Sequence, residues 1–122
     1  MNLNIITQNK VTLAELISDK IEISTLQDSL DLIGNAHYLG ASGAVICEGQ
    51  LSPDFFDLKT RLAGEILQKF ANYHFRLSIV GDFSKYESNA LNAFIIECNR
   101  GSHISFVDNR ELALVTISGS PA

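Results

Sequence analysis

A strand–helix–strand pattern in residues 43–84 constrains the fold more than any other feature of this sequence. Two apolar runs, residues 44–47 and 75–80, flank a segment, residues 52–72, in which apolar side chains recur every three or four positions. That period lays an apolar stripe along one side of an α-helix. Ser52, followed by a proline and an acid, is a typical helix start. We therefore predict one continuous helix over residues 52–72 between two strands.

Further strands and helices alternate on either side of this unit. Residues 3–7 and 11–17 alternate apolar with polar side chains around a short turn, which predicts an antiparallel hairpin. The other expected elements are a helix over residues 24–39, a helix from residue 86 or 88 to 99, a strand over 103–107 and a short helix over 111–115. The pattern at residues 111–117 leaves both helix and strand open.

The expected element order is therefore β-β-α-β-α-β-α-β-α. Strands that alternate with helices favour a mainly parallel sheet with right-handed crossovers, here with an antiparallel N-terminal hairpin. The chain has 122 residues, so we expect a single α/β domain over residues 1–122.

Composition excludes several classes of function. Fourteen acids against nine bases give a net charge of −5, and the scattered bases form no nucleic-acid footprint. The apolar runs are too short for a membrane span, and the first ten residues show no hydrophobic export signal. We expect a cytoplasmic protein that binds neither nucleic acid nor membrane and needs no cofactor.

The nucleophilic and metal-binding residue types do not form known motifs. Cys47 and Cys98 lie far apart without a CxxC pattern, so we expect two buried, reduced thiols. The three histidines lack the spacing of a zinc site, and no nucleophile elbow or phosphate loop is present. The sequence therefore favours a protein without catalytic activity over an enzyme and names no catalytic residue.

Polar residues do follow the predicted parallel strands. Ligands of open α/β sheets bind beyond the carboxyl ends of the strands. Acids at three such ends would suit a hard cation such as Mg²⁺, and the neighbouring bases would suit an anion. Alternatively, the acids only cap the helices that follow. The candidate ligand-binding residues are Glu48, Asp82, Ser84, Lys85, Asp108 and Arg110.

Long stretches of the chain resemble a family of small bacterial proteins catalogued as domain of unknown function 4180. The resemblance is densest in residues 51–60, 62–70 and 79–86, and residues 97–101 and 106–107 complete it. It covers nearly the whole chain and implies family membership, but it implies no activity. The end of the chain at residues 112–115 matches least well.

A looser likeness links the chain to the STAS-like fold of anti-sigma factor antagonists. The order of elements is similar, and residues 45–64 resemble the strand, loop and helix that carry the regulatory phosphorylation site of that fold. The likeness implies phosphorylation of Ser52 or Thr60, although the paired serines followed by glycine of that family are missing here.

Two functional hypotheses follow. The first is a non-enzymatic, STAS-like regulatory module that binds another protein through the start of the central helix. It predicts that Phe55 or Phe56 is partly exposed. The second is a small-molecule or Mg²⁺-dependent phosphate-ligand-binding domain that uses the strand-end acids, which should then converge. Both leave the protein partner unidentified and a homodimer open. The candidate interface residues are Ser52, Phe55, Phe56, Asp57 and Thr60.

Overall fold

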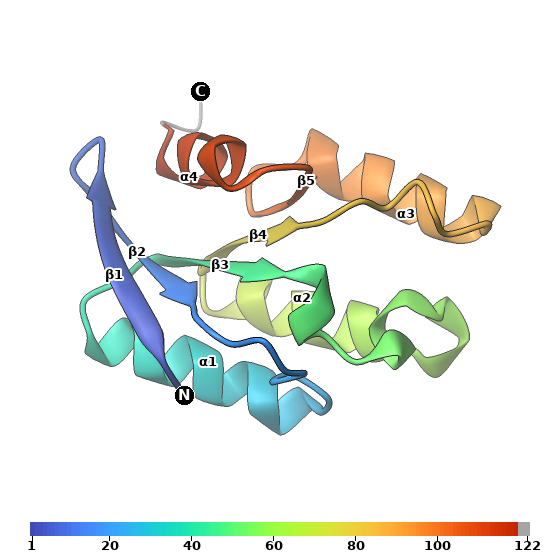
Figure 1. Ribbon diagram of the computed structural model, residues 1–122, viewed down its shortest axis with the longest axis horizontal. Coiled ribbons are helices and arrows are strands. Elements are labelled where there is room, and N and C mark those ends of the chain that lie inside the picture. The colour runs from blue at the N-terminus through green and yellow to red at the C-terminus, as the bar shows by residue number, and fades with distance from the viewer. Residues whose placement is uncertain (120–122) are drawn as a thin grey trace.

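The strands form one five-stranded sheet whose spatial order follows the chain, β1-β2-β3-β4-β5 (Figure 1). The computed structural model describes residues 1–119. The strands are β1 Leu3–Gln8, β2 Val11–Leu16, β3 Gly43–Cys47, β4 Arg76–Val80 and β5 Ile104–Val107, and the helices are α1 Leu26–Tyr38, α2 Leu62–Asn72, α3 Asn89–Arg100 and α4 Arg110–Ser118. The predicted α/β class and element order are confirmed.

The sheet is antiparallel at one end and parallel elsewhere. β1 and β2 pair antiparallel through a two-residue turn, and β2, β3, β4 and β5 are parallel. Both turn residues, Asn9 and Lys10, have positive φ angles of 53° and 65°. Positive φ at both central residues is the property of the hairpin turn whose twist matches that of the strands. The predicted hairpin is therefore present.

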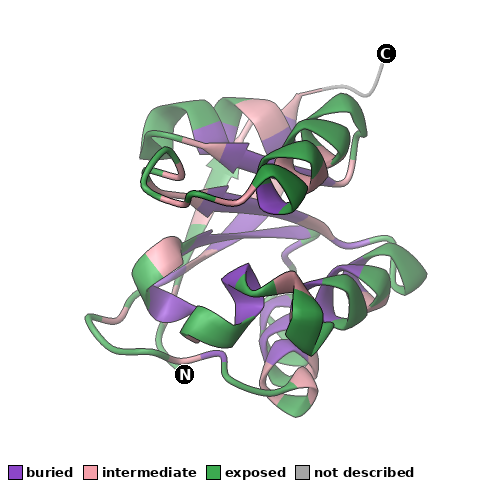
Figure 2. Ribbon diagram, turned by 90° about the vertical axis from the view of Figure 1, so that its right-hand side faces the viewer, coloured by how far each residue is buried: buried purple, intermediate pink, exposed green. Residues whose placement is uncertain are grey.

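Two hydrophobic cores lie on opposite faces of the sheet, because successive side chains of a strand point to opposite sides. The larger core joins Ile46 and Ile79 of the sheet with α1, α2 and the inner side of α3. The smaller one joins Leu13 and Val45 with α4. Figure 2 shows buried residues concentrated along the strands and exposed residues on the outer sides of the helices.

The predicted continuous helix over residues 52–72 is wrong. Two short 3-10 helices, η2 Pro53–Phe56 and η3 Leu58–Thr60, precede α2, and Arg61 takes a left-handed conformation with φ 66°. The Thr60 hydroxyl lies 2.6 Å from the Asp54 carbonyl oxygen and 2.8 Å from that of Asp57, so the side chain holds the corner. The apolar side chains of this stretch are therefore buried by a bent segment and not by one side of a single helix.

The last helix is longer than expected. α4 covers residues 110–118 and begins after Asn109, whose side chain accepts from the Leu112 amide. At the other end, the Arg76 guanidinium donates to the carbonyls of Thr116, Ile117 and Gly119 at 2.9–3.0 Å. A cation at the negative end of a helix stabilises it and satisfies its last carbonyls. Arg76 of β4 thus stabilises the helical conformation of residues 111–117, for which the sequence left both helix and strand open.

Candidate functional site

Glu48 connects the carboxyl ends of β3 and β4. One carboxylate oxygen accepts from the Asp82 amide at 3.1 Å. The other accepts from the Tyr86 hydroxyl at 2.8 Å and pairs with Lys85 Nζ at 2.9 Å. The Glu48 side chain is only 15% exposed, so the loop after β3 and the loop after β4 are tied by a carboxylate that is mostly withdrawn from solvent.

The close approach of Glu48 depends on Gly81. A Cβ atom at position 81 would lie 2.8–2.9 Å from the side-chain atoms of Glu48, so any side chain there would force Glu48 to move. Burial and the neighbouring Glu48 carboxylate raise the pKa of Tyr86 to about 12. Tyr86 therefore stays protonated and keeps donating to Glu48 throughout the neutral range.

Aromatic contacts join the same two loops. Phe56 stacks on Tyr86 with ring centroids 4.8 Å apart and lies 6.1 Å from Phe83. Phe83 in turn meets Phe106 of β5 edge to face at 5.2 Å. Offset or edge-to-face rings at these separations are favourable contacts. Together with Glu48 they make residues 48–61 and 81–88 a single unit, which we call the loop platform.

The candidate interface residues take part in the platform, but not as predicted. Phe55 and Phe56 are 0% and 7% exposed, so the prediction that one of them is partly exposed is wrong. Both rings fill the core beneath the platform, because the bend at Arg61 turns the segment inward. The other candidates are used as caps. Ser52 accepts from the Asp54 amide at 3.3 Å, and Asp57 accepts from the Lys59 amide at 3.2 Å.

The three strand-end acids do not converge. Asp82 accepts from the Ser84 amide and hydroxyl at 3.1 and 2.6 Å, and these bonds lower the pKa of Asp82. Asp108 accepts from the side chain of Asn109 at 3.0 Å. Within residues 1–119, no three Asp, Glu, His or Cys side chains come together as metal ligands. The expected convergence around a cation is therefore wrong.

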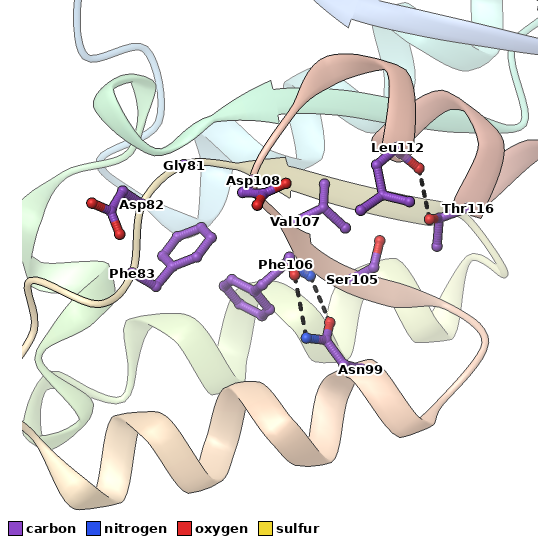
Figure 3. Close-up of a pocket in the computed structure, with 10 residues that line it drawn as sticks. All are labelled: Gly81, Asp82, Phe83, Asn99, Ser105, Phe106, Val107, Asp108, Leu112 and Thr116. Atoms are coloured by element: carbon purple, nitrogen blue, oxygen red, sulfur yellow. Dashed lines mark hydrogen bonds between the residues drawn. The ribbon is translucent and has the colours of Figure 1, made fainter.

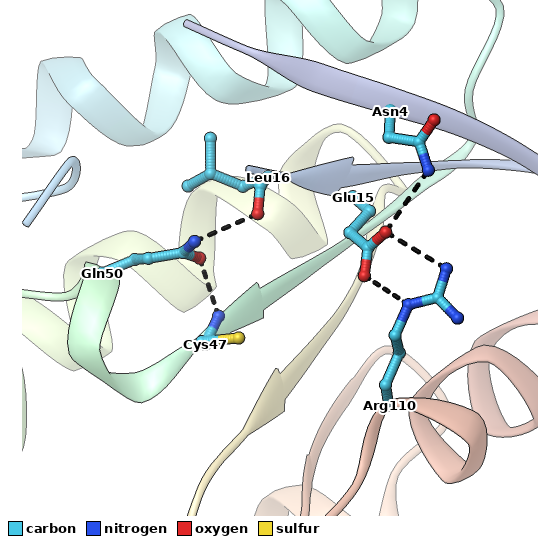
Figure 4. Close-up of polar contacts among 6 residues, drawn as sticks. All are labelled: Asn4, Glu15, Leu16, Cys47, Gln50 and Arg110. Atoms are coloured by element: carbon cyan, nitrogen blue, oxygen red, sulfur yellow. Dashed lines mark hydrogen bonds and ion pairs between the residues drawn. The ribbon is translucent and has the colours of Figure 1, made fainter. Parts of the chain in front are cut away.

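Neither candidate base is free to meet an anion beside those acids. Lys85 pairs with Glu48, and Arg110 makes a bidentate pair with Glu15 of β2, with the longer contact at 3.2 Å (Figure 4). The Arg110 bond lowers the pKa of the Glu15 carboxyl. Because Arg110 opens α4, this ion pair fixes that helix to the face of the sheet opposite α1 and α2.

A pocket of about 510 Å³ lies beside β5, between α3 and α4 (Figure 3). Asp82 and Asp108 stand at it, and Asn99 and Thr116 contribute polar side chains from the two helices. Most of these groups already have partners: Asn99 binds the Phe106 peptide, and the Thr116 hydroxyl donates to the Leu112 carbonyl at 2.7 Å. The lining is also apolar, from Phe83, Phe106, Val107 and Leu112, and its charged groups are the two carboxylates, which suit a molecule with a positive charge and an apolar part.

Sequence reasoning missed Gln50, a buried polar residue that joins the platform to the end of β2 and the residues after it. Its amide donates to the carbonyls of Leu16 and Ser18 at 3.0 and 2.9 Å and accepts from the Cys47 amide at 2.8 Å. Figure 4 shows the contacts with Leu16 and Cys47. A glutamine after a strand carries no local signal of burial, since its three partners come from two separate segments of chain.

The two thiols also differ from the prediction. Cys47 is exposed and Cys98 is half-buried, and both are free. Desolvation raises the pKa of Cys47, and the nearby Glu15 carboxylate raises it further. Cys47 is therefore a thiol at neutral pH and a weak nucleophile.

Fold and site together define a mixed α/β protein whose loops after β3 and β4 are joined by Glu48 and by aromatic contacts. The family model for the domain of unknown function DUF4180 matches residues 8–117, and this protein belongs to that family. The match begins at the last residue of β1. No curated protein and no solved structure matches the chain. Among the described residues, no helix is long and apolar enough to cross a membrane.

Proposed function

We propose that this protein is a non-enzymatic protein-interaction module with a regulatory role, and that the loop platform is its docking surface. The observation that carries the proposal is the mostly buried carboxylate of Glu48, which binds Asp82, Lys85 and Tyr86 and so joins two loops. Loops at this end of a parallel sheet commonly hold binding residues. Loops that are already rigid lose little conformational freedom when a partner binds.

The outer side of the platform supports a protein as the partner. Asp54, Asp57, Lys59 and Arg61 are exposed and carry both signs of charge along one short segment. Mixed charges on a fixed surface select a partner by electrostatic complementarity and suit the polar rim of a transient interface. The buried rings of Phe55 and Phe56 give this surface its shape from beneath.

Thr60 supplies the regulatory step in this proposal. Its side chain is exposed at the corner, yet its hydroxyl approaches two carbonyls there. Phosphorylation would remove that donor and add negative charge beside Asp54 and Asp57, which disrupts a surface by repulsion. We expect Thr60→Glu to abolish partner binding and Thr60→Ser to retain it, measured as recovery of the partner on the immobilised protein.

Charge reversal at Lys59 tests the docking surface. The side chain of Lys59 is exposed, so Lys59→Glu changes the surface without touching the Glu48 contacts. Lys20→Glu is the matched control, because Lys20 is an exposed lysine outside the platform. Each protein is immobilised and incubated with a bacterial lysate. We expect wild type and Lys20→Glu to recover the same partner proteins, and we expect Lys59→Glu not to recover them. The proposal fails if all three recover the same proteins.

The titration of Tyr86 checks that each variant keeps the platform intact. In the intact platform the pKa of Tyr86 is about 12. Absorbance titration should show this late step in wild type and in Lys59→Glu, and Tyr86→Phe should remove it. If a variant that keeps Tyr86 lacks this late titration step, its platform is disrupted. A loss of binding in that variant is then due to altered folding and not to the changed surface charge.

The pocket beside β5 supports a second candidate function, the binding of a small donor-rich or cationic molecule. The observation in its favour is the presence of two acids, Asp82 and Asp108, in a lining that also holds apolar side chains. A ligand at a hundred times its Kd should add about 2.7 kcal/mol to the free energy of unfolding. A thermal-melt screen with organic amines would show this, and Asp82→Asn should remove the shift while Asp19→Asn keeps it. A flat screen would favour the protein partner.

A further inference from the structure

One edge of the sheet, the outer side of β1, presents peptide groups that have no partner within residues 1–119. The Ile17 amide donates to the Asn2 carbonyl at 2.9 Å, and the β1–β2 register continues from that pair. In an antiparallel ladder, residues alternate between those that bond the neighbouring strand and those that face away from it. The N–H and C=O groups of Leu3, Ile5 and Thr7 therefore point away from β2, toward the free edge.

β1 has none of the features that usually block a free edge. Its six residues, Leu3–Gln8, include no charge and no proline, and they pair with β2 without a bulge. Natural proteins blunt exposed edges with such devices because an unmodified edge recruits another strand. Ile5, at the middle of this edge, is 38% exposed. The edge is thus open, uncharged and apolar at its centre.

We propose that β1 pairs antiparallel with β1 of a second copy of this chain, with the two-fold axis at Ile5. The three outward residues are spaced symmetrically about Ile5. In this register Ile5 lies opposite Ile5, and Leu3 lies opposite Thr7, so every outward peptide group of both copies gains a partner. Such self-complementarity is what a two-fold interface requires.

The side chains of β1 support a second copy of this chain as the partner strand. Cross-strand pairs of β-branched and aliphatic residues are favourable, and the pairs formed here are Ile5 with Ile5 and Leu3 with Thr7. The chain carries a net charge of −5, yet β1 itself is neutral. Two copies would therefore meet along a strand that adds no like-charge repulsion of its own, and their sheets would join into one.

Complementary charges at position 5 test the register. Ile5→Lys and Ile5→Glu each place like charges opposite one another across the two-fold axis, which destabilises a strand pair. By light scattering coupled to size exclusion, wild type should have twice the 13.4 kDa mass of the chain. Each variant alone should lose the dimer, and an equimolar mixture of the two should regain it. Ile21→Lys, at an apolar position that is 50% exposed outside β1, is the control and should stay dimeric.

The mixture separates the proposal from misfolding and from other interfaces. Recovery of the dimer in the mixture requires that position 5 of one copy meets position 5 of the other. A monomeric wild type at 100 µM, about the upper end of ordinary assay concentrations, would overturn the proposal. So would a dimer that persists in Ile5→Lys, or a mixture that remains monomeric although both variants are folded.

Discussion

The two edges of the sheet differ in whether their outward peptide groups have hydrogen-bond partners. At β5, the side chain of Asn99 from α3 accepts from the Phe106 amide at 2.7 Å and donates to the Phe106 carbonyl at 3.2 Å, as a neighbouring strand would. At β1, the outward peptide groups face no element of residues 1–119. The difference shows that an amide side chain pairs the outward Phe106 peptide at one edge, whereas the other edge leaves its outward peptide groups without a partner among the described residues.

The closed edge also carries the pocket. Asn99 and Phe106 line it together with the acids at the carboxyl ends of β4 and β5. The contact that covers the edge of β5 thus also fixes the wall of a candidate ligand site. At the other edge, the uncharged strand leaves room for a flat, extended contact. The proposed ligand site and the proposed strand pairing therefore lie at opposite edges of the sheet.

Removal of the Asn99 amide should have the largest effect on this comparison. Asn99→Leu leaves the Phe106 N–H and C=O without their side-chain partners, and each net hydrogen bond contributes about 1 kcal/mol. We expect a loss of about 1–2 kcal/mol in the free energy of unfolding, measured by urea denaturation. Asn92→Leu, at an exposed position of the same helix, is the control and should be close to neutral. Equal losses in both variants would show that Asn99 does not close the edge.

Relief of strain in the β1–β2 turn should have a smaller, stabilising effect. Lys10 has a φ of 65°, which is unfavourable for a residue with a Cβ atom, and Asn-Gly is the preferred pair for this turn. Lys10→Gly should therefore raise the free energy of unfolding by about 0.5 kcal/mol, the strain relieved less the entropy cost of glycine. Lys20→Gly, at a residue without positive φ, should not stabilise the protein. A neutral or destabilising Lys10→Gly would contradict the strained turn.

The smallest expected effect is a change in acid stability near the β1 edge. Asn4 of β1 and Arg110 of α4 both donate to Glu15 of β2, and the Arg110 bond lowers the pKa of Glu15 below its ordinary value of 4.5. A depressed folded-state pKa stabilises the protein above pH 4.5, and this stabilisation is lost as the pH falls through the folded value. Glu15→Gln should thus lose less stability than wild type below pH 4.5 in pH-dependent thermal melts.

The control for the acid effect is Glu65→Gln, because Glu65 is an exposed glutamate on α2, away from this ion pair. It should follow the acid loss of wild type. If Glu15→Gln follows that loss as well, the Glu15–Arg110 pair does not link α4 to β2 in solution.

Most of the fold was predictable because the spacing of apolar residues within a short stretch of sequence distinguishes strands from helices. The hairpin, the parallel strands and three of the four helices lie within a few residues of their predicted ranges. The bend at Arg61 was not predictable from the period alone. Burial of Phe55 and Phe56 in succession fits a helix as well as a bend, since Ile66 and Leu67 are also buried in succession within α2. The bend is accompanied by contacts of the Thr60 hydroxyl with two backbone carbonyls, which the apolar period does not encode.

The site was less predictable than the fold, because its contacts join distant segments. The sequence identified Glu48 and Asp82 as strand-end acids, but it could not show that the Glu48 carboxylate accepts from the Asp82 amide. Arg110 and Glu15, which form an ion pair, lie 95 positions apart in the sequence. The Asn99 side chain pairs with the N–H and C=O groups of Phe106 as the backbone of a neighbouring strand would. Such contacts follow from where the folded elements lie, which residue spacing does not encode.

Amide hydrogen exchange at the two edges tests the central claim most directly. The account predicts that the Phe106 amide is protected at every protein concentration, because Asn99 of the same chain accepts its hydrogen bond. It predicts that the Ile5 and Thr7 amides exchange rapidly in dilute protein and become protected as concentration rises and β1 pairs with a second copy. Rapid exchange of Ile5 and Thr7 at all concentrations, or an unprotected Phe106 amide, would contradict it.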